Sequence, residues 1–129
     1  MLNMHVIHAG DFMETTVAGA LDYERSRAML LGIARANEPR HLNLLIDLRG
    51  AYGGAGISFP DVFRLVAVLE EHPDAFRGNR VALLDEFDEQ LEKTQFFEAS
   101  ATHKGFHVRT FIQYEAALRW LHGAPEVVR

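Results

Sequence analysis

The stretch LNLLIDLRGAYGGAGISFPDVFRLVAVLEE, residues 42–71, carries the clearest indications of secondary structure in the chain. Its first part, 42–48, is apolar at nearly every position, which is typical of a central strand covered on both faces. Its last part, 60–71, repeats apolar residues at the helical spacing i, i+3, i+4, i+7, namely Val62, Leu65, Val66 and Leu69. A glycine-rich segment joins them. This order of strand, loop and helix predicts an α/β fold.

The same alternation continues downstream. Residues 80–86 form a second apolar stretch, and residues 106–112 are typical of a last strand. Between them, 88–105 is expected to be a helix that begins at Asp88 as its N-cap and ends at Gly105. Residues 114–123 predict a short final helix.

Upstream, two short β-rich segments, 4–9 and 13–20, are separated by Gly-Asp-Phe and predict an antiparallel pair. Asp22 is expected to cap a helix that starts at Tyr23 and stops near Asn37. The whole chain therefore predicts one α/β domain, 1–129, with a mixed sheet of about five strands flanked by about four helices.

Composition excludes several classes of function. The chain has 13 basic and 18 acidic residues, a formal charge of −5, and no clustered basic patch of the kind that nucleic-acid binding requires. It has no cysteine, which excludes disulfides, thiolate metal sites and thiol catalysis. Without a signal peptide or a membrane-spanning apolar run, it is expected to be cytoplasmic. We expect no cofactor and no metal.

Four segments also resemble a known family. VAGALDYERSRAML (17–30), NLLIDLRGA (43–51), RVALLDE (80–86) and EKTQFFEASATHKGFHVRTFIQYEAALRWL (92–121) are similar to the SpoIIAA-like proteins, relatives of the STAS domain. The resemblance implies a compact, bacterial, cytoplasmic module that acts as a protein-interaction or nucleotide-sensing switch. It also implies a grouping by fold with the Sec14-type lipid carriers.

The glycine-rich segment follows a strand and precedes a helix, a place where ligands bind in many α/β folds. Its glycines, however, fit neither the G-x-G-x-x-G pattern nor the P-loop, and no lysine follows them for a phosphate. Nucleotide hydrolysis is therefore not expected. One interpretation is a surface loop in which glycines only provide turns; another is a binding surface that includes Tyr52, Gly53, Gly54, Ser58 and Phe59.

Ser58 has two interpretations of its own. It precedes a helix by the spacing of an N-cap residue, three positions before Asp61. The resemblance implies a phosphorylation switch near this place, although the Asp-Ser-Ser-Gly type of motif is replaced by GGAGISFPD.

Two acidic residues form the next candidate. Asp47 and Asp85 lie at the ends of the two apolar strands and are expected to reach one crevice, with Arg49 beside them. Such a carboxylate pair would hold a metal or do acid–base work. Ion pairing with Arg49 is the simpler interpretation of Asp47.

Four phenylalanines on two predicted helices, with Tyr52 on the loop, either fill the core or line a pocket for an apolar ligand: Phe59, Phe63, Phe96 and Phe97.

The sequence leaves three candidate functions for the chain. The first is a non-enzymatic SpoIIAA-like module that binds a protein partner or itself, as a homodimer, through residues 50–59 and the next helix. The second is a carrier of a small apolar ligand or lipid. The third is an enzyme centred on Asp47, Arg49 and Asp85.

Overall fold

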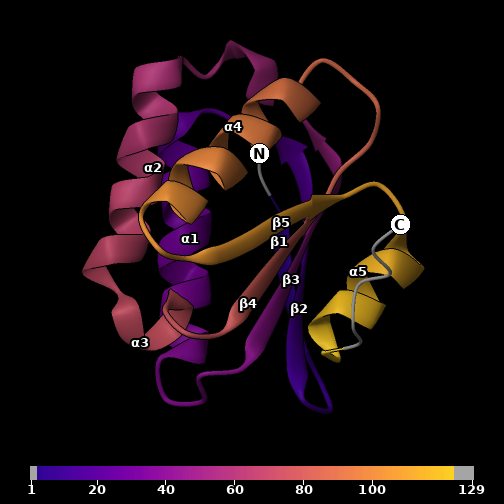
Figure 1. Ribbon diagram of the computed structural model, residues 1–129. Helices are drawn as coiled ribbons and strands as arrows, with labels where there is room; N and C mark the ends of the chain where they lie inside the picture. Colours follow the sequence, from indigo (N-terminus) through magenta and orange to yellow (C-terminus); the bar gives the residue numbers. More distant parts are fainter. Residues whose placement is uncertain (1–2, 124–129) are drawn as a thin grey trace.

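The computed structural model describes residues 3–123, except for the side chains of residues 7–9. Five strands and five α-helices alternate along the chain after an initial hairpin (Figure 1). They are β1 (Asn3–Ala9), β2 (Phe12–Ala20), α1 (Tyr23–Asn37), β3 (Asn43–Tyr52), the 3₁₀ turn η1 (Gly54–Gly56), α2 (Phe59–Glu71), α3 (Pro73–Phe76), β4 (Arg80–Leu84), α4 (Leu91–His103), β5 (His107–Phe111) and α5 (Tyr114–Leu121).

The sheet has the order β1-β2-β3-β4-β5, so each strand lies beside its neighbour in sequence. β1 and β2 pair antiparallel, whereas β2, β3, β4 and β5 are parallel. The mixed α/β sheet predicted from the sequence is thus confirmed.

The two faces of the sheet are covered unequally. α1, α2 and α4 pack on one face over the larger core, which includes Met13, Ile33, Ile46, Leu69 and Phe106. On the other face α5 packs over a smaller cluster around Phe12, Leu45 and Leu121. Figure 1 shows α5 alone on its side of the sheet. No helix within the described part of the chain is long and apolar enough to cross a membrane.

Local signals explain where several elements begin and end. Asp22 accepts a hydrogen bond from the backbone N–H of Arg25 at 2.8 Å, as expected of the N-cap of α1. Asn37, fully buried at the end of α1, donates to the carbonyls of Leu42 and Ala75. It therefore fixes both the end of this helix and the entry into β3. Gly105 has a φ of +93°, which confirms its predicted place after α4.

Three predictions differ from the structure. β3 runs on to Tyr52, so the first part of the glycine-rich segment is strand and not loop. α4 begins at Leu91, because Asp88 accepts from the N–H of Gln90 in a local turn and does not cap the helix. The short helix α3, which begins at a proline, was not predicted, so the helices number five where about four were expected.

Candidate functional site

The segment after β3 is fastened to α4. Gly53 has a φ of +87° and lies so close to the Leu21 carbonyl that an added Cβ would come within 3.1 Å of its oxygen. The N–H of Gly54 donates to Gln90 Oε1 at 3.3 Å. Lys93 Nζ donates to the carbonyl of Ala55 at 2.9 Å and also to that of Ile57. These bonds hold η1 and Ile57 against the first turns of α4.

Ser58 caps α2. Its exposed side chain accepts a hydrogen bond from the N–H of Asp61 at 3.1 Å. The capping interpretation of Ser58 is therefore confirmed, whereas phosphorylation of this hydroxyl stays a prediction. Asp61 in turn pairs with Arg64 at 3.0 Å on the surface of the helix.

Next to this cap, three aromatic rings form what we call the aromatic surface, defined as Phe59, Phe63 and Phe96. Phe96 of α4 packs edge-on against Phe59 and Phe63 of α2, with ring centroids 4.7 and 5.2 Å apart. The Lys93 ammonium lies 4.6 Å from the centre of the Phe59 ring. Despite these contacts, Phe59 is 42% exposed and Phe63 is 54% exposed.

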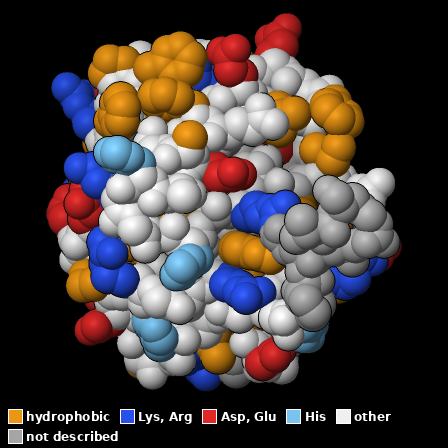
Figure 2. Space-filling view, viewed as in Figure 1, with side chains coloured by type: hydrophobic (Ala, Val, Ile, Leu, Met, Phe, Trp, Pro, Cys, Tyr) orange, Lys and Arg blue, Asp and Glu red, His pale blue; other side chains and the backbone are white. Residues whose placement is uncertain are grey.

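Figure 2 shows hydrophobic side chains gathered over the upper part of α2, beside α4. Two further aromatic residues are exposed at the carboxyl ends of the strands: Tyr52 (63%) at the end of β3 and Phe87 (82%) after β4. Four of these five rings therefore present apolar area to solvent, and Phe96 is half-buried behind two of them.

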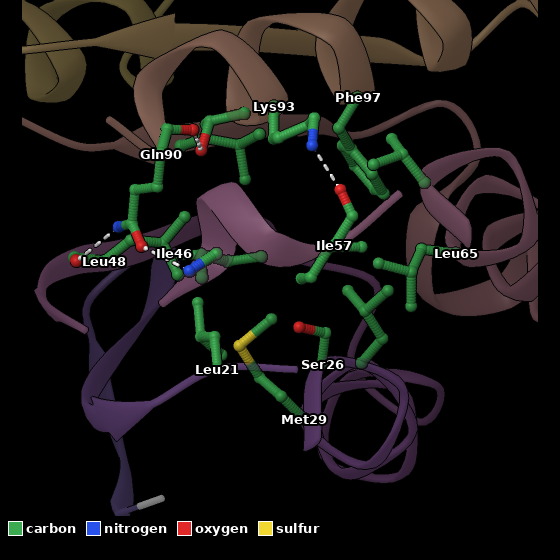
Figure 3. A pocket seen from close by; sticks show the side chains of 15 residues that line it. Leu21, Ser26, Met29, Ile46, Leu48, Ile57, Leu65, Gln90, Lys93 and Phe97 are labelled. Carbon is green, nitrogen blue, oxygen red and sulfur yellow. Dashed lines mark hydrogen bonds between the residues drawn. The ribbon is translucent and has the colours of Figure 1, made fainter. Parts of the chain in front are cut away.

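An apolar pocket of about 80 Å³ lies beneath η1, between α1, α2 and α4 (Figure 3). Of the four phenylalanines for which the sequence left core and pocket open, only Phe97 lines this pocket. Phe59 and Phe63 instead lie on the outer surface, because they occupy the exposed side of α2. The pocket is also far smaller than the roughly 300–1,000 Å³ of typical ligand sites, so a lipid chain does not fit.

Asp85 lies completely buried at the end of β4. Its carboxylate accepts hydrogen bonds from Gln90 Nε2 (3.0 Å), Thr94 Oγ1 (2.7 Å) and the N–H of Glu86 (2.9 Å). Because Gln90 and Thr94 also line the pocket, Asp85 fixes the wall formed by α4.

Asp47 lies in a different environment. Arg49 donates to both oxygens of its carboxylate, through Nε at 3.0 Å and Nη2 at 2.9 Å, and this pairing raises the pKa of Arg49. The Arg49 guanidinium lies 5.9 Å from the centre of the Tyr114 ring of α5. Tyr114 donates to Glu14 at 2.7 Å, and this bond, with partial burial, raises the pKa of Tyr114 to about 12.

The structure does not bring Asp47 and Asp85 together. Asp47 follows Ile46, whose side chain enters the larger core, so it points to the α5 face. Asp85 contacts α4 on the opposite face. Among the described residues, no group of three or more His, Asp or Glu side chains is placed to hold a metal ion. The predicted carboxylate crevice is therefore wrong.

Sequence reasoning overlooked three residues that shape these sites: Gln90, Lys93 and Tyr114. Gln90 and Lys93 are three positions apart at the start of α4, a spacing that puts both on one helix face. That spacing could have indicated that both side chains reach the same neighbouring segment. The bond from Tyr114 to Glu14 joins residues 100 positions apart, and no local pattern indicates it.

Comparisons with known proteins identify the fold. No protein-family model and no curated protein matches this sequence. Among solved structures, it is similar to an anti-sigma factor antagonist from Mycobacterium paratuberculosis, with 13% identity, 95% of each chain covered and a TM-score of 0.69.

It is also similar to an uncharacterized protein of the DUF3478 family from Shewanella loihica PV-4, described as having a SpoIIAA-like fold. There the identity is 18%, 93% of each chain is covered and the TM-score is 0.56. Both proteins are bacterial. At such identities the likeness is one of fold, and it confirms the resemblance drawn from the sequence at that level. The chain has a SpoIIAA-like fold.

Proposed function

We propose that this chain is a protein-interaction module and that it binds its partner through the aromatic surface and the start of α2. The observation that carries this proposal is the exposure of Phe59 and Phe63, which are held in place by contact with Phe96. Contiguous exposed apolar patches often mark interaction sites, and aromatic residues are enriched among the hot spots of protein interfaces.

The surroundings of these rings favour a preformed site. Lys93 stacks on Phe59 and fastens the preceding turn, so little ordering of the backbone is needed on binding. A rigid surface loses less conformational entropy when a partner docks, which strengthens binding. One solved structure of the same fold is an anti-sigma factor antagonist, a protein whose name describes action on another protein. That likeness supports the class of function and does not identify the partner.

Ser58 offers a way to regulate the same surface. It is exposed and directly precedes Phe59, so a phosphate on its oxygen would place about two negative charges at the edge of the aromatic surface. The phosphate would also replace the hydroxyl that accepts from Asp61 N–H, beside the Asp61 carboxylate. We therefore propose that phosphorylation of Ser58 weakens partner binding.

Site-specific photo-crosslinking tests the proposal. A benzoylphenylalanine at position 63 should crosslink to a partner in the cells that produce this chain, and the same residue at position 112 should not. Ile112 is the matched control because it is also exposed (41%) but follows β5. A crosslink to a second copy of the chain would identify self-association as the interaction.

The captured partner, once purified, is then titrated against variants. Phe63→Ser should lower the affinity at least tenfold, and Ile112→Ser should leave it unchanged. Ser58→Asp should weaken binding, whereas Ser58→Asn, which retains a good N-cap, should not. Equal affinities for the wild type and Phe63→Ser would refute the proposed surface.

A further inference from the structure

The pocket beneath η1 is built from several elements and lies at the carboxyl ends of β3 and β4. Its walls are almost entirely apolar and include Met29 of α1, Ile46 of β3, Leu65 of α2 and Phe97 of α4. Ile57 closes it from the side of the 3₁₀ turn, and the hydrogen bonds of Lys93 and Gln90 keep that closure in place (Figure 3). It is partly open to solvent. In parallel α/β sheets this end of the strands is where small molecules usually bind.

The polar side chains around the pocket differ in whether they already have hydrogen-bond partners in the protein. Gln90 and Thr94 are bound to Asp85, and Lys93 is bound to two backbone carbonyls. Ser26 is only 4% exposed, and Figure 3 shows its hydroxyl pointing into the pocket. Within the described part of the chain, this hydroxyl has no hydrogen-bond partner. The hydroxyl is open to the pocket, so an occupant with a hydroxyl or carbonyl oxygen at this place could form a hydrogen bond with it.

We propose that this pocket binds a small, uncharged molecule that is apolar over most of its surface and carries one hydroxyl or carbonyl oxygen for Ser26. The volume of about 80 Å³ limits the buried part of the molecule to a short hydrocarbon group. No acidic side chain of the described residues lines the pocket, so an amine would find no counter-charge there. The ammonium of Lys93 is already held by the carbonyls of Ala55 and Ile57, and the apolar walls would make the desolvation of a carboxylate or phosphate costly. The site is separate from the aromatic surface, so it does not rest on partner binding.

A series of straight-chain alcohols from ethanol to hexanol is the probe. Each alcohol is titrated into the whole protein, and the methyl NMR signals of Met29, Ile57 and Leu65 are followed as reporters of the pocket. These signals should shift and saturate. Affinity should rise about fourfold for each added methylene group, as expected for burial of hydrocarbon, and should stop rising once the chain outgrows the pocket.

Two serine variants separate the role of the hydroxyl from that of the apolar walls. Ser26→Ala should weaken every alcohol about fivefold and leave the dependence on chain length unchanged. Ser100→Ala is the matched control, because Ser100 is also buried on a helix but does not line the pocket, and it should bind as the wild type does.

Two outcomes would overturn the proposal. If the pocket methyl signals do not saturate with any alcohol, the pocket is not a binding site. If the alcohols bind equally well to the wild type and Ser26→Ala, the hydroxyl does not select the ligand and the proposed ligand class is wrong.

Discussion

Asp47 lies within β3 and Asp85 directly follows the adjacent parallel strand β4, yet their carboxylates have opposite surroundings. Asp85 is completely buried and is satisfied by two side chains and one backbone group, none of them charged. The Asp47 side chain retains a tenth of its exposure and binds one cation, Arg49, which is itself 42% exposed. The first carboxylate links β4 to α4, whereas the second forms a pair with a residue of its own strand.

Two aspartates can therefore contribute differently to stability, because the contribution depends on how deeply the carboxylate is buried and on whether its hydrogen-bond donors are charged. A buried carboxylate held by neutral donors is costly to disturb, because every donor around it would lose its acceptor. An ion pair with a partly exposed cation contributes less, because water screens the Arg49 guanidinium. Neither residue therefore needs a catalytic role to explain its position.

Of the substitutions considered for the two carboxylates, replacing Asp85 should lower the free energy of unfolding the most. Asp85→Ala leaves the Gln90 amide and the Thr94 hydroxyl without their acceptor in the interior, so the free energy of unfolding should fall by about 3 kcal/mol. Urea denaturation measures it. Asp85→Asn retains an oxygen acceptor and should lose clearly less. Equal losses for the two variants would show that the charge, and not the hydrogen bonding, matters.

Tyr114, beside the Asp47–Arg49 pair, should make stability depend on alkaline pH. Its pKa is about 12 in the folded protein and about 10 in an unfolded chain, so the folded state holds the proton more tightly. The resulting stability is fully present below pH 10 and is lost as the pH rises from 10 through 12.

Denaturation across this range should show a steeper loss for the wild type than for Tyr114→Phe. At neutral pH the same variant should cost about 1 kcal/mol, through the lost hydrogen bond to Glu14. Tyr52→Phe, at an exposed position, is the control and should follow the wild type. A wild type and a Tyr114→Phe variant with parallel pH profiles would contradict the raised pKa.

The ion pair between Asp47 and Arg49 should make the smallest contribution to the free energy of unfolding. A double-mutant cycle with Asp47→Ala, Arg49→Ala and the combined variant should yield a coupling energy of about 0.5 kcal/mol. The coupling should decrease further in 1 M salt. A value above that measured for loss of the Asp85 hydrogen bonds would reverse the comparison between the two carboxylates.

Much of the fold could be predicted because its signals are local. Asp22 and Ser58 cap helices where the sequence placed them, and the apolar stretch in 42–48 lies in the central strand. Asp88 misled the prediction of α4 because an aspartate that starts a turn looks, in sequence, like one that caps a helix. Gly50 was expected to belong to a loop, but it lies in β3. A glycine fits there because a Cβ would come within 3.1 Å of the Val17 carbonyl oxygen.

The sites could be predicted less well, because they depend on which side of an element a residue faces. Asp47 pairs in register with Leu84 and not with Asp85, so the two carboxylates are out of phase by one residue and face opposite sides of the sheet. Phe59 and Phe63 are large and apolar, as pocket residues often are, but they lie on the side of α2 that faces away from the sheet. Register and helix orientation arise from tertiary packing, which no short stretch of sequence specifies.

The order of the strands has a consequence for how the chain folds. Because the sheet follows the chain from β1 to β5, each strand can pair as soon as its predecessor is in place. Such short-range connections reduce the entropy lost in closing loops and favour fast folding. α5 is the exception, since its hydrogen bonds reach Glu14 and Asn43, 100 and 78 positions away in sequence. We therefore expect α5 to dock last, covering the second face of the sheet only after the strands beneath it have formed.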